Sequence, residues 1–445
     1  MDGVVKPLEI VVVQFLINFN KKLTICITII GDTYCKLVIM RNKLFFYLVL
    51  LSILSFSCKR KDKETSEDKM VSSIQISPEI SDGSETLQSH IKNLQLIKLQ
   101  TNDSVVIGGL IDKIEFVDNK YYIKQISSLT DKPIFVFDST GNYIRSIGKH
   151  GRGPREFLSL NDMIVDNRVI LFTWDGDFTK GLFYTLNGKY LKEEKLKIPI
   201  SKSIKLDPNL FVFYCGTGKV MPDGTLPYAL YFTDSSFNVL SKHRRRDENA
   251  PSIGTWTSIF SEYQEAISFL GEFQDTVYLI KNKNTINPQY HLEFGNYQLT
   301  LTDKLLKKKY QNNPVKYNKT RKKEKFVMYL KYAQNSKYFW VNYHVKVNSF
   351  DKHFALYSKA KDTVYNFSCE SNGPLIELLS NLVSYSGKSF VFYVQPDKFI
   401  KIAENLRQQI NRGNLQEEQY LKDILNISKQ VDKSDNPLLV NVTLK

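Results

Sequence analysis

A glycine-rich loop carries the most suggestive group of polar side chains in this sequence. Residues 148–154 have the sequence Gly-Lys-His-Gly-Arg-Gly-Pro, and Arg155 and Glu156 follow them. The loop lacks the Gly-Lys-Ser/Thr ending of a phosphate-binding loop and does not open a helix. We therefore interpret its glycines as a tight passage between two strands. Four of its side chains remain candidates for contacting a ligand: His150, Arg152, Arg155 and Glu156.

The residue patterns of hydrolytic and metal chemistry are missing from the chain. It has no His-Glu-x-x-His arrangement, no Gly-x-Ser-x-Gly elbow and no Cys-x-x-Cys pair. Asp175 and Asp177 flank a glycine but lack the rest of a calcium-binding loop, so a turn is the simpler interpretation. We predict no catalytic residue, no metal and no cofactor, although carboxylates from distant strands could still meet in the fold.

Cys58 stands where a lipoprotein signal peptide would be cleaved. Residues 40–43 are basic, residues 44–56 are apolar, and the small Ser57 precedes the cysteine. This order is that of a signal peptide, and the apolar run is shorter than the roughly 20 residues of a spanning helix. We predict that residues 40–57 are the signal peptide and that Cys58 becomes the acylated first residue. An uncleaved hydrophobic anchor is the alternative.

The segments on either side of this signal have different characters. Residues 1–39 precede it, although a secretory signal works at the start of a chain, so we expect translation to begin at Met40. The alternative is a membrane contact through residues 10–30, but polar residues interrupt that stretch. Residues 58–75 are charged and polar without apolar periodicity, which predicts a flexible tether.

The chain is strongly basic. It carries 61 Lys and Arg against 46 Asp and Glu, a formal charge of +15, and its densest basic runs are residues 243–246, 307–309 and 321–323. Such a balance raises the question of a polyanionic partner. Because an exported protein rarely meets nucleic acid, we expect no nucleic-acid partner. We interpret the runs as solvated loops, with contact to anionic lipid or glycan as the second choice.

A strand-turn-strand pattern repeats along the body of the chain. Turns centred on Gly141, Gly188 and Phe237 each join two short apolar stretches, at spacings of 47 and 49 residues. Weaker copies have polar turns at residues 282–284, 359–361 and 395–397, which makes six hairpins in all. A period of about 40 to 50 residues is typical of a four-stranded propeller blade. The sequence therefore predicts an all-β fold, a six-bladed β-propeller over residues 76–445.

Three further segments complete this prediction. The Lys-rich residues 304–325 are interpreted as an insertion between blades. Two apolar stripes with helical spacing, broken at Gly413, predict short C-terminal helices packed outside the ring. Their residues are Ile402, Leu406 and Ile410 in the first stripe, and Leu421, Ile424 and Leu425 in the second.

The last residues predict how the ring closes. Leu438, Val440, Val442 and Leu444 alternate as in a half-buried strand, and an open propeller would expose long unpaired edges. We expect this strand to share a blade with N-terminal strands from residues 94–117.

Two cysteines lie within the predicted propeller. Cys215 and Cys369 stand in apolar strand-like runs, where a buried free thiol is the simpler expectation. A disulfide between them in an oxidising compartment is the alternative.

The motifs resemble those of one known family. Residues 134–138 (Ile-Phe-Val-Phe-Asp), Gly141 and the glycines of the 147–157 segment match its first-blade signature. Asp-Thr-Val-Tyr at residues 275–278 and again at 362–365 matches a later signature, and residues 436–440 match its closing strand. On these residues the chain resembles the six-bladed propeller lipoproteins of Gram-negative bacteria related to NHL-repeat proteins, from about Cys58 to Lys445.

The resemblance implies a location more than an activity. It implies an exported lipoprotein held by its lipid, in the outer membrane of a Gram-negative bacterium. We expect a binding or scaffolding propeller whose partner is an envelope glycan, peptide or protein. The alternative is an enzyme of the lyase or lactonase-like type acting on a carbohydrate or small ester. Three or more Asp, Glu, Asn or His side chains converging at the channel mouth would favour the enzyme, and an apolar or basic mouth would favour binding.

Overall fold

The structure is a computed structural model that describes the propeller and leaves out the N-terminal segments. It describes residues 71–126, 132–174, 179–216, 221, 227–245, 259–271, 274–297, 309, 313, 315–316, 326–346, 350–369, 373–386, 388–413 and 418–445. Several predictions lie outside these ranges: the leader, the signal peptide, Cys58, the Asp175 and Asp177 turn, Arg246 and almost all of residues 304–325.

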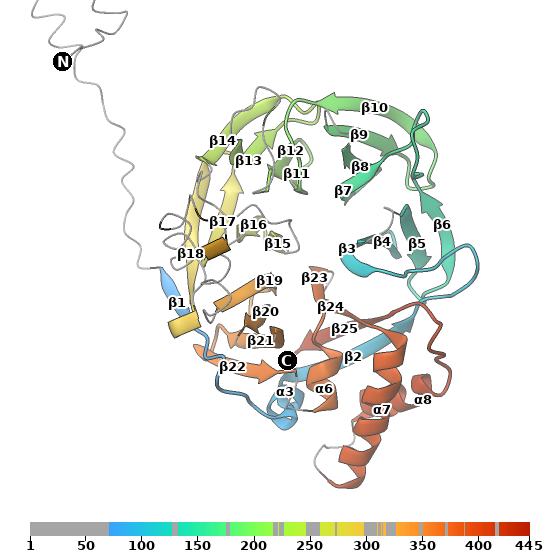
Figure 1. The fold of residues 1–445 in the computed structure, drawn as a ribbon, viewed down its shortest axis with the longest axis vertical. Helices are drawn as coiled ribbons and strands as arrows, with labels where there is room; N and C mark the ends of the chain where they lie inside the picture. Colours follow the sequence, from blue (N-terminus) through green and yellow to red (C-terminus); the bar gives the residue numbers. More distant parts are fainter. Residues whose placement is uncertain are drawn as a thin grey trace, which may run out of the picture. The chain divides into compact units, whose positions relative to one another are not determined.

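Six antiparallel sheets stand side by side in a ring, which confirms the predicted six-bladed propeller (Figure 1). One strand of each sheet lies innermost, and consecutive inner strands contact one another around the whole ring. The inner strands are β3 (Leu110–Val117), β7 (Ser159–Val165), β11 (Lys202–Asp207), β15 (Phe260–Tyr263), β19 (Phe326–Gln334) and β23 (Leu382–Ser386).

In the first five blades, three further strands follow the inner strand outwards in chain order. The first three blades continue with β4 (Lys120–Ile126), β5 (Ile134–Asp138) and β6 (Tyr143–Ile147); β8 (Val169–Trp174), β9 (Thr179–Tyr184) and β10 (Tyr190–Leu196); and β12 (Leu210–Tyr214), β13 (Tyr228–Thr233) and β14 (Val239–Arg245). The next two continue with β16 (Ala266–Phe269), β17 (Thr276–Asn282) and β18 (Thr285–Glu293); and β20 (Tyr338–Lys346), β21 (Phe350–Ser358) and β22 (Thr363–Ser368).

The core lies between neighbouring blades. Tyr122 and Val136 of the first blade, for example, pack against Met163 and Leu171 of the second, and all four are fully buried. Each sheet therefore has apolar residues on both faces, which explains the near-continuous apolar runs such as residues 210–214. Burial of this kind stabilises the ring by about 25 cal/mol per Å² of apolar surface.

The repeated hairpin turns share one local structure. The Asp138 Oδ1 atom accepts hydrogen bonds from the backbone N–H groups of Thr140 and Asn142, both at 2.9 Å. Asp234 makes the same two contacts with the second and fourth residues after it. Gly141 takes a φ of 95° in the first of these turns, a conformation that costs glycine little. The turns predicted at Gly141 and Phe237 are therefore confirmed, and consecutive strands also end and begin around Gly188, residues 282–284 and residues 359–361, as predicted.

The ring is closed by both ends of the propeller, as predicted. The sixth sheet has the order β2 (Ile91–Lys98), β25 (Leu438–Leu444), β24 (Ser389–Val394) and β23. Val440 of β25 lies opposite Leu96 on one side and Phe392 on the other. The C-terminal strand thus has two hydrogen-bonded neighbours, one from each end of the sequence.

Asn436 fastens the segment that leads into this strand. Its Nδ2 atom donates to the backbone oxygens of Gln100 at 2.7 Å and Val105 at 3.0 Å. Its Oδ1 atom accepts from the N–H of Ile107 at 2.7 Å, and its own N–H donates to Thr101 Oγ1. The Asn436 residue is 1% exposed, so these bonds are shielded from water.

Four short helices pack beside the closing blade, outside the ring (Figure 1). They are α3 (Ser84–His90), α6 (Pro374–Leu378), α7 (Pro396–Asn411) and α8 (Gln419–Ser428). The two predicted stripes form the buried faces of α7 and α8, with Ile402 and Leu406 on α7, and Leu421 and Ile424 on α8. Among the described residues, no helix is long and apolar enough to cross a membrane.

One detail of the predicted repeat is wrong. Residues 395–397 are not a hairpin turn, because Pro396 begins α7; proline and an acidic residue such as Asp397 suit the first turn of a helix as well as a turn.

The two Asp-Thr-Val-Tyr segments lie at different places in their blades. Thr276 opens β17, the third strand of its blade, whereas Thr363 opens β22, a fourth strand.

One strand has no counterpart in the predicted repeat. β1 (Ser72–Gln75) adds a fifth, outermost strand to the blade of β15–β18 and runs parallel to β18, with Ser72 opposite Tyr290. The described chain therefore starts on the outer edge of this blade. Cys215 and Cys369 are both buried, lie in different core clusters and are not joined to each other, so the disulfide alternative does not hold.

We expect Asn436→Ala to lower the free energy of unfolding by about 2–4 kcal/mol, because three buried backbone groups lose their partner. Urea unfolding followed by circular dichroism measures this loss. Asn287→Ala, at an exposed position of β18, is the control and should stay within about 0.5 kcal/mol of the wild type. Equal stabilities for the two variants would show that the Asn436 contacts do not hold the ring closed.

Candidate functional site

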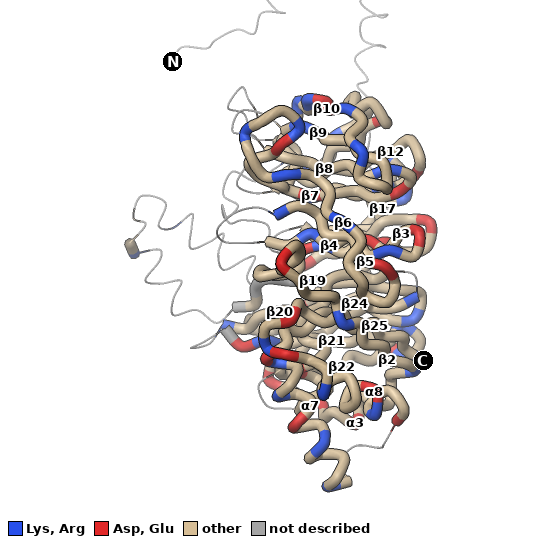
Figure 2. Tube along the Cα trace, turned by 90° about the vertical axis from the view of Figure 1, so that its right-hand side faces the viewer, with Lys and Arg blue, Asp and Glu red and all other residues tan. Residues whose placement is uncertain are grey.

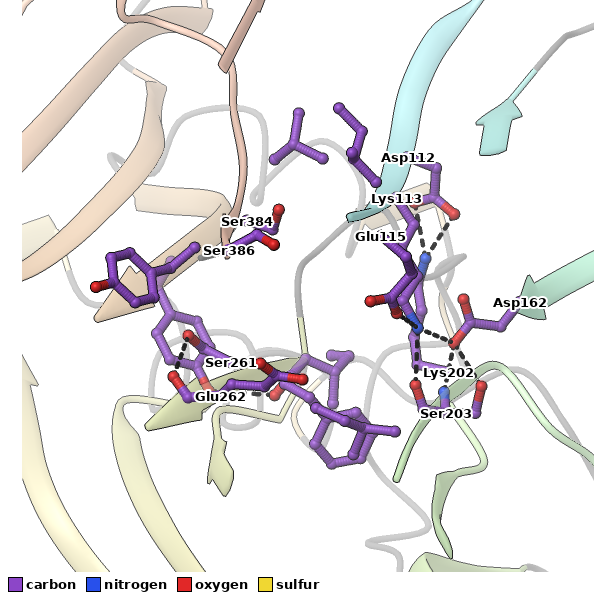
Figure 3. A pocket seen from close by; sticks show the side chains of 17 residues that line it. Asp112, Lys113, Glu115, Asp162, Lys202, Ser203, Ser261, Glu262, Ser384 and Ser386 are labelled. Atoms are coloured by element: carbon purple, nitrogen blue, oxygen red, sulfur yellow. Dashed lines mark hydrogen bonds and ion pairs between the residues drawn. The ribbon is translucent and has the colours of Figure 1, made fainter. Parts of the chain in front are cut away.

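Polar and charged side chains of the inner strands line a small cavity in the central channel (Figure 3). This channel cavity measures about 90 Å³ and draws residues from all six inner strands. Its charged residues are Asp112, Lys113, Glu115, Asp162, Lys202 and Glu262. Alternation along each inner strand explains this lining, because side chains that do not enter the core between blades face the channel.

A buried carboxylate joins two lysines at one edge of the channel cavity. The Asp112 carboxylate lies 2.6 Å from Lys124 Nζ and 2.7 Å from Lys202 Nζ. Burial alone would raise the pKa of Asp112, but the two ammonium groups outweigh it and hold the pKa well below its usual range. Asp112 is therefore ionised, and its ion pair with Lys202 connects the first and third blades.

Lys113 is a second point of contact between blades. Its Nζ atom donates to the backbone oxygens of Met163 at 2.7 Å and Ser203 at 3.0 Å, and lies 3.2 Å from Glu115 Oε1. Asp162, in turn, accepts hydrogen bonds from the Ser203 backbone and hydroxyl through Oδ2. Figure 3 shows Lys113 between Glu115 and Asp162 on one side of the cavity.

Glu115 is the acidic group of the channel whose protonation responds near neutral pH. Loss of hydration raises its pKa to about 7, and the nearby Glu262 carboxylate adds to the rise, while Lys113 opposes it. Ser384 stands on the facing side of the cavity, and its hydroxyl has no partner among the described residues. This end of the channel is therefore polar and mainly acidic.

A larger cavity lies at the end of the ring where the inner strands β3 and β23 begin. This cavity, which we call the basic chamber, measures about 410 Å³. It is lined by Leu110, Ile111, Ile126, Lys331, Asn342, His344, Lys352, Ser380, Asn381, Leu382 and Tyr393. Its lining holds two lysines and no carboxylate, and its volume is within the roughly 300–1,000 Å³ of small-molecule sites.

Two lysines set the charge of the basic chamber. Burial lowers the pKa of Lys331 to about 8; the neighbouring lysines Lys202, Lys352 and Lys124 add to the lowering, and Asp112 opposes it. Burial likewise lowers the pKa of Lys352, whose Nζ atom donates to Asn381 Oδ1 at 2.7 Å. Both lysines are thus held in a partly desolvated space.

His344 brings a neutral ring to the same chamber. Burial and the charges of Lys352 and His353 lower its pKa to about 4. The ring is therefore uncharged at neutral pH and adds no positive charge to that of the lysines.

The loop singled out in the sequence lies elsewhere. Glu156 accepts a hydrogen bond from the Gly153 N–H at 2.8 Å and pairs with Lys149 Nζ at 2.7 Å. His150 forms a backbone bridge with Phe157, whose ring is buried. Glu156 and His150 therefore contact their own loop.

The two arginines of that loop face outwards. The Arg155 guanidinium lies 4.8 Å from the centre of the Tyr190 ring, on the outermost strand β10 of the next blade. Arg152 is exposed. None of the four predicted ligand-binding residues lines the channel cavity or the basic chamber. A binding role for them remains a prediction.

Sequence reasoning missed the residues that the fold brings together. Asp112 and Lys202 are 90 positions apart and sit on different blades. A signal was present in the form of charged residues inside otherwise apolar strands, such as Asp112 and Lys113 between Ile111 and Ile114. Of the residues that the structure describes, no three His, Cys, Asp or Glu side chains lie in a group that could hold a metal ion.

We expect Asp112→Asn to lower the free energy of unfolding at about pH 7 by about 3–5 kcal/mol, because two buried lysines lose their counter-charge. Folding lowers the pKa of this carboxyl, so its contribution is present above the unfolded value of about 3.9 and is lost as the pH falls below it. Urea unfolding at pH 7 and near pH 2.5 should therefore show a smaller gap between variant and wild type in acid. The exposed Asp103→Asn is the control, and a gap that persists unchanged in acid would contradict the assignment.

Comparison with known proteins identifies a family and similar solved structures. The chain matches the family described as Domain of unknown function (DUF4934) over residues 71–443. No curated protein matches it. Among solved structures, a presumed exported protein of Bacteroides fragilis is 20% identical, covers 84% of this chain and 99% of its own, and superposes with a TM-score of 0.65. A DUF4221 family member from Bacteroides vulgatus is 8% identical, covers 80% and 99%, and has a TM-score of 0.45.

The likeness to the first of these structures supports the propeller fold. The family match runs from just before β1 to the end of β25 and so includes every blade, the channel cavity and the basic chamber. The chain belongs to the Domain of unknown function (DUF4934) family.

Proposed function

We propose that this protein is an exported lipoprotein whose propeller binds an envelope ligand in the basic chamber. The chamber is the observation that carries the proposal. It has the volume of a small-molecule site, an apolar wall and a few polar groups held in place by neighbouring strands. Asn381, for example, donates to the Tyr393 backbone oxygen at 3.2 Å while it accepts from Lys352.

An exposed residue at the rim of the chamber indicates that a ligand can enter from solvent. Leu110 lines the chamber and is 50% exposed, whereas the wall residues Ile111 and Leu382 are fully buried. A ligand would enter past Leu110 and meet Lys331 and Lys352 within. The two lysines correspond to the basic mouth that favours binding. The amide and imidazole groups of Asn342, His344 and Asn381 in the same lining, and the four carboxylates of the channel cavity, meet the criterion that favours an enzyme.

The location rests on the N-terminal sequence. Cys58 follows a short basic segment and an apolar run in the order of a lipoprotein signal, and the presumed export of the Bacteroides fragilis protein agrees with it. We propose that residues 40–57 are removed, that Cys58 carries the lipid, and that the anchor lies in the outer membrane. The likeness to NHL-repeat lipoproteins belongs to this same proposal.

The raised pKa of Glu115 favours the alternative, an enzyme of the lyase or lactonase-like type. A carboxyl group with a pKa of about 7 exchanges a proton readily at neutral pH, as a general acid or base must. Lys113 holds Glu115 on one side of the channel cavity, and Glu262 also lines that cavity. The cavity of about 90 Å³ is small for a carbohydrate substrate, so we favour binding in the larger chamber.

Cys58→Ala should move the protein from the membrane to the soluble fraction, because lipid chains contribute about 0.8 kcal/mol of membrane affinity per buried CH₂ group. Fractionation with a carbonate wash and immunoblotting measures this shift, and Ser57→Ala, which keeps a small residue before the cysteine, is the control. A Cys58→Ala protein that stays in washed membranes would overturn the lipid anchor.

Leu110→Trp should abolish ligand retention, because the larger ring fills the rim of the basic chamber. The measurement is mass spectrometry of compounds retained from a panel of envelope glycans and peptides. Leu191→Trp is the matched control, since Leu191 is also 50% exposed but lies on the outer strand β10. A panel in which nothing is retained by the wild type, or in which Leu110→Trp retains the same compounds, would contradict the proposal.

A further inference from the structure

The basic chamber has an unbalanced charge. Lys331 and Lys352 line it, and no carboxylate does. Asp112 is the carboxylate that opposes the lowering of the Lys331 pKa. This carboxylate is already in direct contact with Lys124 and Lys202. Asp112 is therefore shared by Lys124, Lys202 and Lys331, and no carboxylate is among the groups that shift the pKa of Lys352, which leaves a local excess of positive charge.

Lys331 is the lysine of the chamber that has no direct polar contact among the described residues. Within the described part of the chain, its ammonium group makes no hydrogen bond and no ion pair. Lys331 is half-buried, and a partly desolvated charge without a partner costs free energy that a counter-ion would recover. The outer surface is different, because Lys and Arg alternate with Asp and Glu along the side of the propeller seen in Figure 2.

Hydrogen-bonding groups surround the unpaired charge. The Ser380 hydroxyl is buried in the chamber wall and has no partner among the described residues. The Asn342 amide, which also lines the chamber, donates to the Ser380 backbone oxygen and fixes that residue. Lys352 is positioned by Asn381. The chamber thus presents a buried hydroxyl and two ammonium groups on rigid strands and their connections.

We infer that the basic chamber binds a small oxyanion, a compound with carboxylate or phosphate groups, whose charge pairs with Lys331 and Lys352. The inference deepens the proposed binding function and rests on it. The oxyanion would supply the missing counter-charge and accept a hydrogen bond from the Ser380 hydroxyl. The apolar wall formed by Leu110, Ile111 and Leu382 would contact the ligand's uncharged part.

The pH dependence of binding follows from the groups that face the chamber. The titratable groups of the lining are Lys331 from β19, His344 from β20, Lys352 from β21 and Tyr393 from β24. Asp112 from β3, Lys124 from β4 and Lys202 from β11 lie outside the lining and act on the charge of Lys331. His344 and Tyr393 stay neutral near pH 7, because burial lowers the pKa of the first to about 4 and raises that of the second to about 12. Lys331 loses its proton above about pH 8, so affinity should fall there.

Isothermal titration calorimetry on the purified protein tests this inference. The probes are inorganic phosphate and glucose 6-phosphate in one arm, and glucuronate and citrate in the other, with glucose as the neutral comparison. We expect at least one arm to bind at pH 7 and to bind more weakly at pH 9.5. Binding confined to one arm identifies the oxyanion as a phosphate or a carboxylate.

Two variants test whether the calorimetric binding signal comes from the basic chamber. Lys331→Met and Lys352→Gln should each weaken binding of the active probe by about 10- to 100-fold, the usual effect of losing a charge-assisted bond. Lys401→Gln, at an exposed position of α7, removes the same charge without touching the chamber and should bind as the wild type does. Lys331→Met should also keep or raise the melting temperature, because it removes an unpaired, half-buried charge, so lost binding would not reflect unfolding.

The inference fails if no probe in either arm binds, or if Lys331→Met binds the active probe as tightly as Lys401→Gln does. Failure of the proposed function has a different signature. If a neutral glycan or peptide is retained by the wild type and lost in Leu110→Trp, the chamber is a binding site whose ligand is not an anion. If neither anions nor panel compounds depend on Leu110, both conclusions are overturned.

Discussion

The structure depends on the pairing of β25 with β2 and β24. This pairing joins residues near both ends of the propeller in one blade, and without it two blade faces and their strand edges would be exposed to water. It also brings β23 against β3, which completes the wall of inner strands. Every charge contact across the channel, including Asp112 with Lys202, requires this closed wall.

The two cavities of the closed ring differ in their balance of acidic and basic side chains. Around the channel cavity, four carboxylates face two lysines, and most of the charged groups are already bonded: the Ser203 backbone N–H donates to Asp162, and Lys113 pairs with Glu115. These contacts tie neighbouring blades together and leave little space. Around the basic chamber the lysines outnumber the carboxylates, and the space is several times larger. The first arrangement suits structural pairing, and the second suits a ligand that brings its own negative charge.

The sequence predicted what local rules determine. Asp138 and Asp234 form the same turn through contacts within five residues of sequence, and the alternation from Leu438 to Leu444 is a property of one strand, so both predictions were confirmed. Pro396 was misassigned because its preference is compatible with a turn and with a helix start. The basic chamber was not foreseen, because Leu110, Lys331 and Lys352 meet only through the order of the blades, and no spacing along the chain records that order.

The most direct test of this account is a crystal of the protein grown with selenate, an oxyanion that can be located by its anomalous scattering. The account predicts a strong peak inside the basic chamber, at the charge-assisted hydrogen-bond distance of about 2.7–2.9 Å from the Nζ atoms of Lys331 and Lys352. Peaks confined to exposed lysines on the outer strands, with an empty chamber, would contradict it.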